Sequence, residues 1–351
     1  MDVDAIRGER LARQRLLDEP YPDITAVVGH LTAVQSQEFE DACRMLSRRV
    51  LGDPSLASIA DQVATGDVVR THVLRPTWHF VRTDDLDWML DLTAERVHAQ
   101  MRSQYRSAGF GDDRARAVGL VADVLAAASE PLTRREIGAE LAERGLTITG
   151  QPLSQLTLAA ELDKMAITGP RRGSWDTFLS YRSRIPESAQ IDRDEAVATL
   201  ARRYLDSHAP ATAKDFAWWS GLTLTDARAG FAATGVVEVG DGLFSTGGVE
   251  ASARGTAHLL SMFDEYVIAY PDRSACCEPG DFDLSIKNLV LVDGAVVGRW
   301  RIKRSRTKNP DTLEIGLYKP VSKTGRGLID VAAQRLLRPQ STAMDIVVTA
   351  G

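Results

Sequence analysis

The sequence predicts an α+β protein in which three successive helix-rich units, each closing with strands, precede a β-rich C-terminal region. Three observations support this. Residues 1–248 show three rounds of amphipathic helices followed by short runs with strand-like alternation. Residues 249–351 alternate mostly like strands, with a small helical piece at 328–337. The length of 351 residues exceeds one comfortable hydrophobic core. We therefore expect four domains, at 1–112, 113–187, 188–248 and 249–351.

The first unit begins with a short amphipathic helix at 6–17, whose arginines most often indicate a solvated face but could also contact phosphate. Apolar residues at helical spacing predict a helix through 24–34, a second follows residue 37, and another spans 55–65. Residues 68–81 then alternate as strand, turn and strand around 75–77. Three helices and a hairpin are the order of elements in a winged-helix domain.

The second and third units repeat this order after a connecting helix at 84–106 and a linker at 109–113. Helices are expected at 115–128, 133–145 and 153–165, followed by a wing at 167–181 with Arg171 and Arg172 near its tip. Arginine at a wing tip tends to contact phosphate or the minor groove when DNA is bound. The third unit has helices at 194–207, 212–219 and 224–233 and a strand at 236–239. Three tandem winged-helix domains are the fold that we predict.

Composition excludes several classes of protein. No apolar run reaches membrane-spanning length and the N-terminus lacks the pattern of a secretion signal, so we expect a cytoplasmic protein. The three cysteines form no C-x-x-C pair and the six histidines are scattered, which argues against a zinc site. Because three tandem units can form a continuous surface, a monomer is sufficient.

The charge is unevenly distributed. A net charge of −6 argues against a protein that coats nucleic acid indiscriminately. Residues 299–308 are nevertheless rich in basic side chains and contain no acid. If this segment is a strand, alternate residues place several of these cations on one face, which suits a local DNA contact. A solvated edge strand protected by charge explains the pattern equally well. The candidate DNA-binding residues in this segment are Arg299, Arg301, Lys303, Arg304 and Arg306.

The triplet Gln35-Ser36-Gln37 is the candidate functional motif. One predicted helix leads into it and another leads out. Residues two apart on an unbroken helix do not share a face, so the two glutamines can serve one site only if the backbone turns between them. Ser36 is a suitable place for that turn, because its hydroxyl can cap the second helix. The alternative is that both glutamines are ordinary solvated helix residues.

Three further stretches accompany the triplet: RTHVLRPTWHFV at 70–81, LLSMFDEYVIAYPDRS at 259–274 and DGAVVGRWRIKRS at 293–305. With them the sequence resembles the AlkZ/YcaQ superfamily of DNA glycosylases. These are built from tandem winged-helix domains and carry a Gln-x-Gln or Gln-x-Asp motif at the catalytic centre. The middle position of the family motif is usually aliphatic, whereas this chain has Ser36.

The resemblance implies that Gln35 and Gln37 jointly place a water and stabilise positive charge during hydrolysis of an N-glycosidic bond. The expected partner is duplex DNA carrying an N7-alkylpurine or a crosslink, and neither a metal nor an organic cofactor is implied. An N7-alkylated purine is already cationic, so its departure needs no protonation, and neutral amides can suffice. We expect Thr71, Trp78 and His79 to line a cleft beside the glutamines, although a lone histidine in a strand is more often packed or on the surface.

Two other functions fit the same elements. The chain could be a DNA-binding regulator without catalysis, but the predicted helix at 153–165 offers few side chains that read bases. It could also be an interaction scaffold, because winged helices serve many functions. We rank the glycosylase first, the regulator second and the scaffold third.

Overall fold

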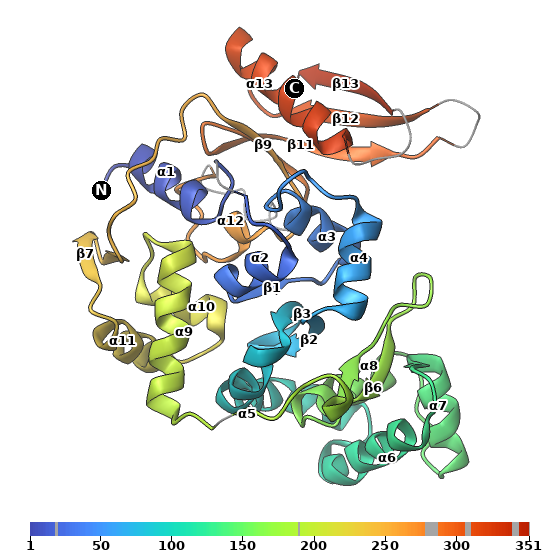
Figure 1. Ribbon diagram of the computed structural model, residues 1–351. Helices are drawn as coiled ribbons and strands as arrows, with labels where there is room; N and C mark the ends of the chain where they lie inside the picture. Colours follow the sequence, from blue (N-terminus) through green and yellow to red (C-terminus); the bar gives the residue numbers. More distant parts are fainter. Residues whose placement is uncertain (18–19, 189, 278–286, 306–309, 339–343, 351) are drawn as a thin grey trace.

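The order helix, strand, two helices and two strands occurs twice in succession along the chain, and a third repeat follows with an isolated bridge in the place of its first strand (Figure 1). This computed structural model describes all residues except 18–19, 189, 278–286, 306–309, 339–343 and 351. A five-stranded sheet with one covering helix follows the third repeat. The mixed helical and β character predicted from the sequence is confirmed.

The first repeat follows the N-terminal helix α1 (Val3–Arg13) and forms a three-stranded antiparallel sheet in the order β1-β3-β2. Both faces of this sheet are buried, because one face packs on the helices of its own repeat and the other on the rest of the helical region. The elements are α2 (Ile24–Leu31), β1 (Ala33–Gln35), α3 (Phe39–Ser47), α4 (Leu56–Thr65), β2 (Val68–Val73) and β3 (Arg75–Arg82).

The second repeat follows the long helix α5 (Thr83–Ser107) and the short turn η1 (Gly111–Asp113). Its strands again run in the order of first, third and second, and Thr133 caps α7 reciprocally with Glu136. The elements are α6 (Arg114–Ala127), β4 (Leu132–Thr133), α7 (Arg134–Glu143), α8 (Gly150–Leu162), β5 (Ala166–Thr168), β6 (Thr177–Ser180) and the turn η2 (Tyr181–Ser183).

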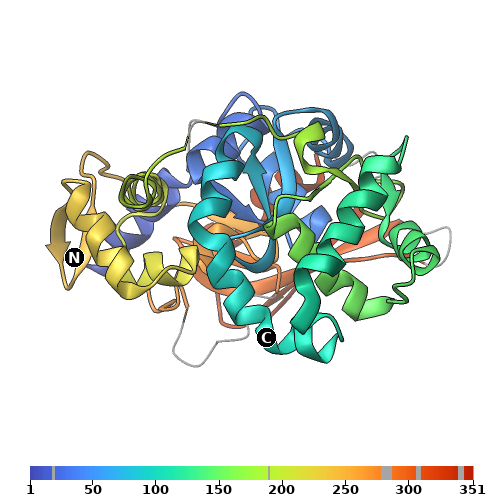
Figure 2. The same ribbon diagram turned by 90° about the horizontal axis from the view of Figure 1, so that it is seen from below.

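The third repeat has only a bridge between Ala211 and Phe244 in the place of its first strand. Trp219 is buried whereas Trp218 is 46% exposed, as expected for neighbours that cannot both enter a core. Seen from below, the second and third repeats lie on opposite sides of α5 (Figure 2). The elements are α9 (Arg193–His208), α10 (Ala213–Ser220), α11 (Leu224–Ala233), β7 (Val237–Gly240) and β8 (Leu243–Ser245).

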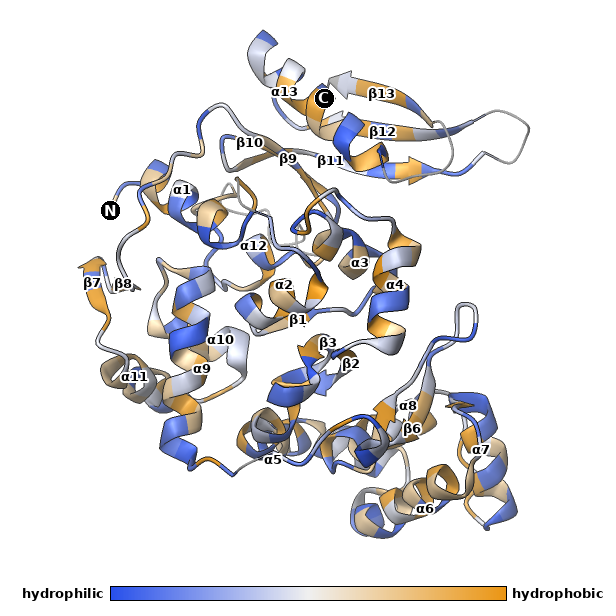
Figure 3. Cartoon of the chain, viewed as in Figure 1, coloured by the Kyte–Doolittle hydropathy of each residue, from blue (hydrophilic) through white to orange (hydrophobic). Residues whose placement is uncertain are grey.

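The C-terminal sheet has the strand order β13-β12-β11-β10-β9, antiparallel except for the β12–β13 pair, which is parallel and connected through α13. The buried side of α13 packs on this sheet, and its opposite side is mostly polar and charged apart from Val331, which is 65% exposed (Figure 3). The elements are β9 (Ala257–Leu260), α12 (Glu265–Ile268), β10 (Leu289–Val292), β11 (Ala295–Lys303), β12 (Asp311–Leu317), α13 (Lys323–Leu337) and β13 (Met344–Ala350).

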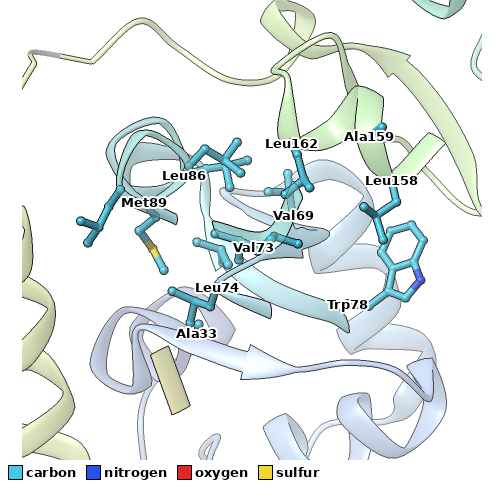
Figure 4. Packing of buried hydrophobic residues seen from close by; sticks show 14 of the residues in the cluster. Ala33, Val69, Val73, Leu74, Trp78, Leu86, Met89, Leu158, Ala159 and Leu162 are labelled. Atoms are coloured by element: carbon cyan, nitrogen blue, oxygen red, sulfur yellow. The ribbon is translucent and has the colours of Figure 1, made fainter. Parts of the chain in front are cut away.

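One continuous core links the first sheet to the second and third repeats. Figure 4 shows apolar side chains of this core, with Ala33, Val69 and Val73 from the first sheet facing Leu86 of α5 and Leu162 of α8. The three repeats therefore do not have three separate cores, and the strand that ends in Gln35 belongs to the shared one.

Two expectations about the first 40 residues are wrong. The helix expected to lead into the triplet ends at Leu31, because Thr32 has a positive φ of 69° and the chain continues as β1. Val34 fits both a helical and an alternating pattern, which explains the error. Ser36 does not cap the following helix either, since that position is occupied by Glu38.

The N-terminal helix also differs from the expectation. It spans Val3–Arg13 instead of 6–17, and it stops because Arg15 has a positive φ of 57°. Its arginines do not form a solvated face. Arg10 donates two hydrogen bonds to the carbonyl of Pro210, and Arg13 donates to Ser245 Oγ at 3.1 Å. They fasten α1 to the third repeat.

Candidate active site

The two glutamines lie where β1 ends and the chain turns toward α3. Gln35 is the last residue of β1 and is only 6% exposed, Ser36 is fully buried, and Gln37 is exposed. Along β1, Ala33 and Val34 enter different cores, which is the alternation expected of a strand. Gln37, however, lies beyond the end of β1 in a bend of the chain, so the alternation of the strand does not decide whether the two side chains share a face.

An arginine fixes the side chain of Gln35. Arg75, the first residue of β3, donates from Nη2 to Gln35 Oε1 at 3.0 Å. The same nitrogen lies 3.5 Å from His79 Nε2. A guanidinium only donates, so the amide oxygen must face it. The Nε2 group of Gln35 therefore points away from Arg75, and it donates no hydrogen bond to any described residue.

Arg70 holds the backbone of the turn. From β2 it donates to the carbonyls of Ser36 at 3.0 Å and Gln37 at 3.1 Å, and to Asp176 Oδ2 at 2.8 Å. Its guanidinium also lies over the ring of Trp78, 4.3 Å from the centroid. Burial lowers the pKa of Arg70, while the Asp176 carboxylate opposes that shift. One buried cation thus joins the triplet to the second repeat.

A fully buried carboxylate supports the triplet from the C-terminal region. Glu265 Oε1 accepts from the backbone N–H of Gln35 at 2.9 Å. Its Oε2 accepts from Trp219 Nε1 at 3.1 Å and lies 3.5 Å from His208 Nε2. The neighbouring Asp264 makes two hydrogen bonds with Arg49, at 2.8 and 3.0 Å, just after α3. These contacts fasten α12 to the first repeat.

No role was expected from the sequence for Arg70, Arg75, Asp264 or Glu265. A signal for the acids was present, because Asp264 and Glu265 are consecutive charges in an otherwise apolar stretch. Acids in such surroundings are usually buried and paired. Nothing in the sequence indicated that Arg70 and Arg75 point toward residues 35–37, since that depends on strand pairing.

Thr71, Trp78 and His79, which were expected to line a cleft, are buried in strands β2 and β3 of the sheet that ends at the triplet. His79 pairs with Gln35 across β1 and β3 and with Thr71 across β2 and β3. Burial, followed by the charge of Arg75, holds the pKa of His79 well below its usual value, so the ring is neutral. Thr71 donates to Glu161 Oε1 at 3.3 Å, and Trp78 is 7% exposed. They pack against the triplet instead of facing solvent.

The expected wing residues already have protein partners. Arg171 pairs with Asp176 at 3.1 Å and lies over the ring of Phe39, 4.3 Å from its centroid. Arg172 pairs with Glu136 at 2.8 Å, but its side chain remains 53% exposed. The structure therefore brings Arg171 to the triplet and leaves Arg172 outside it.

The basic strand is β11, and the alternation predicted for it is confirmed. Arg299, Arg301 and Lys303 are exposed, whereas Trp300 is buried and Ile302 is half-buried. Glu314 on β12 pairs with Arg301 at 2.6 Å and with Lys303 at 3.4 Å.

The remaining candidates on this strand differ in their partners. Arg304 lies 3.3 Å from Asp311, and Arg306 lies outside the described residues. Arg299 has no ion-pair partner within the described part of the chain and lines a shallow cavity with Lys287. Glu314 and Asp311 therefore neutralise much of the basic charge on this strand. No hydrogen bond or ion pair between described residues joins the strand to the triplet.

Two classes of feature are absent from the described residues. No group of three or more histidine, cysteine, aspartate or glutamate side chains among them could hold a metal ion. Within the same residues, no helix is long and apolar enough to cross a membrane.

Comparison with known proteins identifies a family and a similar solved structure. A model of the AlkZ-like DNA glycosylase family matches residues 28–338. The fold is similar to that of the DNA glycosylase AlkZ of Streptomyces sahachiroi, with a TM-score of 0.79, 22% sequence identity and coverage of 100% of both chains. No curated protein matches the chain significantly.

Proposed function

The chain belongs to the AlkZ-like family of DNA glycosylases, and on this premise we propose that it excises N7-alkylated purines from duplex DNA with Gln35 and Gln37 as the catalytic pair. The observation that carries the proposal is the set of buried contacts that hold the triplet. Arg70, Arg75 and Glu265 come from three different elements and all bond to residues 35–37. Ordinary solvated glutamines would not be held in this way.

The geometry suggests different tasks for the two amides. Gln35 Oε1 is already engaged by Arg75, whereas its Nε2 group has no acceptor among the described residues and could donate to a sugar or phosphate oxygen. Gln37 is exposed and its side chain has no hydrogen-bond partner within the described residues, so its amide oxygen can accept from a water. Gln35 would orient the nucleotide while Gln37 places the attacking water.

The proposed class of substrate follows from the lack of an accessible acid or strong base among the residues that form and support the triplet. A neutral amide neither protonates a leaving base nor strongly activates water. Glu265 is fully buried, and both its oxygens accept hydrogen bonds from Gln35 and Trp219. The lesion must therefore leave easily, as a cationic N7-alkylpurine does. No organic cofactor is required for such a reaction.

We also propose that the three repeats are winged-helix domains, with domains 1–112, 113–187 and 188–248 ahead of the C-terminal region 249–351. The support is the repeated order of elements and, in the first two repeats, the repeated strand order of first, third and second. A cytoplasmic monomer on damaged duplex is the arrangement that we expect. Arg299, which is exposed and has no ion-pair partner among the described residues, is the strongest candidate for a phosphate contact.

The test uses duplex DNA that contains one N7-methylguanine. Excision leaves an abasic site, and heating in alkali then breaks the strand there. We expect cleavage by the natural protein and a loss of ~10²-fold or more for Gln37→Ala, the size seen when a single positioning group is removed from an active site. Its affinity for the duplex should be unchanged.

Gln100→Ala is the matched control, because Gln100 is an exposed glutamine on α5. It should cleave at the natural rate. Intact DNA after incubation of the natural protein with several N7 adducts would overturn the proposed substrate. Full activity of Gln37→Ala would overturn the proposed site.

A further inference from the structure

Trp175 is exposed at the tip of the hairpin between β5 and β6. Its side chain is 70% exposed, a large fraction for a tryptophan. The tip is a well-formed turn, because Arg172 and Trp175 exchange backbone hydrogen bonds of 2.9 and 3.2 Å, and Gly173 supplies a positive φ of 62°. The ring is thus presented to solvent on an ordered scaffold instead of completing a core.

The hairpin is attached to the glutamine triplet. Asp176, the next residue along the chain, accepts from Arg70 at 2.8 Å and from Arg171 at 3.1 Å. Arg70 in turn donates to the carbonyl of Gln37 at 3.1 Å. Trp175 therefore directly precedes Asp176, which is joined to the backbone of Gln37 through hydrogen bonds of Arg70.

A second contact holds the hairpin at the same place. Arg171 lies over the ring of Phe39, the first residue of α3 and only two residues after Gln37. In Figure 1 the hairpin leading into β6 extends from the second repeat toward α4 of the first. Two independent contacts thus hold the hairpin that carries the exposed indole against the residues that flank the triplet.

We propose that Trp175 is a stacking platform for a nucleobase of the damaged duplex, placed by the contacts of Asp176 and Arg171. This inference rests on the proposed function, because it needs duplex DNA at residues 35–37. An indole stacks on any base, and hairpins that enter the minor groove often insert an apolar side chain between base steps. Arg172, which faces Trp175 across the turn, pairs with Glu136 but remains 53% exposed, so its guanidinium can also approach an adjoining phosphate.

The test compares Trp175→Ala with Trp175→Phe on duplex containing N7-methylguanine. Stacking predicts about 5- to 100-fold weaker binding and a matching rise in KM for Trp175→Ala, with kcat nearly unchanged. Trp175→Phe keeps a ring and should recover most of the affinity. Leu51→Ala is the matched control, because Leu51 is also 70% exposed and lies on another loop. It should bind like the natural protein.

Fluorescence supplies a reading that does not need catalysis. A base stacked on Trp175 should quench part of the tryptophan emission when the duplex is added, and Trp175→Phe should lose that part. Equal binding by Trp175→Ala and the natural protein, or equal quenching in Trp175→Phe, overturns the inference even when excision is normal. Normal quenching without excision would overturn the proposed function and leave the stacking site standing.

Discussion

Replacing Arg75 with methionine should impair the chemical step without weakening DNA binding. In the structure, Arg75 Nη2 donates to Gln35 Oε1 at 3.0 Å. This bond orients the amide, and without it the side chain can rotate and present oxygen or nitrogen at random. Methionine keeps most of the volume of the aliphatic stem but removes the donor.

The magnitude follows from the type of bond. Hydrogen bonds to charged groups contribute about 1.5–3 kcal/mol. If that orientation is needed only in the transition state, kcat should fall by roughly 10- to 150-fold. Single-turnover excision of N7-methylguanine at saturating protein measures this rate, and a binding titration with the same duplex measures affinity. Lysine at this position should restore part of the rate, because it still donates.

Arg82→Met is the matched control. Arg82 ends the same strand, and its side chain is 35% exposed and paired with Asp84, which is 63% exposed. Such exposed pairs contribute little to stability, so this variant should bind and cleave normally. Thermal unfolding of both variants separates a local effect from loss of the fold. A natural excision rate for a folded Arg75→Met protein would refute the idea that this arginine orients Gln35.

Two further predictions concern stability. Arg49→Met should lower the free energy of unfolding by about 3–5 kcal/mol, measured in urea, because it leaves the buried Asp264 carboxylate unpaired. Burial lowers the pKa of His258 from 6.5 to about 4. Between these two pH values the imidazole is protonated in the unfolded chain but neutral in the folded chain, so acidification favours unfolding. The natural protein should lose up to about 3 kcal/mol from this group between pH 6.5 and pH 4 and none above pH 7, and His258→Phe should lose less on acidification.

Local sequence patterns predicted the helices of the second and third repeats to within a few residues. The reciprocal cap at Thr133 is an example, because its signal is local and the structure contains both hydrogen bonds. The same reasoning failed at 24–38. There the apolar spacing fits a helix, but the chain turns at Thr32 and pairs Val34 with Phe80, almost fifty residues further on. Tertiary pairing overrides a local pattern in such a case.

The candidate site was only partly predictable for the same reason. The triplet itself could be singled out, but the residues that hold it come from β2, β3 and α12. Arg75 was expected merely to lie in a turn, and its direction depends on the tight turn at Leu74, which has a positive φ of 63°. Periodicity shows which face of a strand a residue occupies but not which distant residue it meets.

The charges around Gln35 explain why a site built on amides can contain an arginine. Arg75 retains its proton, since a guanidinium is not deprotonated in proteins, and burial and Glu265 act on its pKa in opposite directions. An unopposed cation beside the sugar would resist the positive charge that develops as the base leaves. The carboxylate of Glu265 accepts a hydrogen bond from the backbone of Gln35, so its negative charge offsets the positive charge of Arg75. Because Glu265 is fully buried, it does this from the protein interior and does not contact the solvent. In the proposed complex the substrate would then meet the neutral amide dipole of Gln35, which suits a leaving base that already carries its own positive charge.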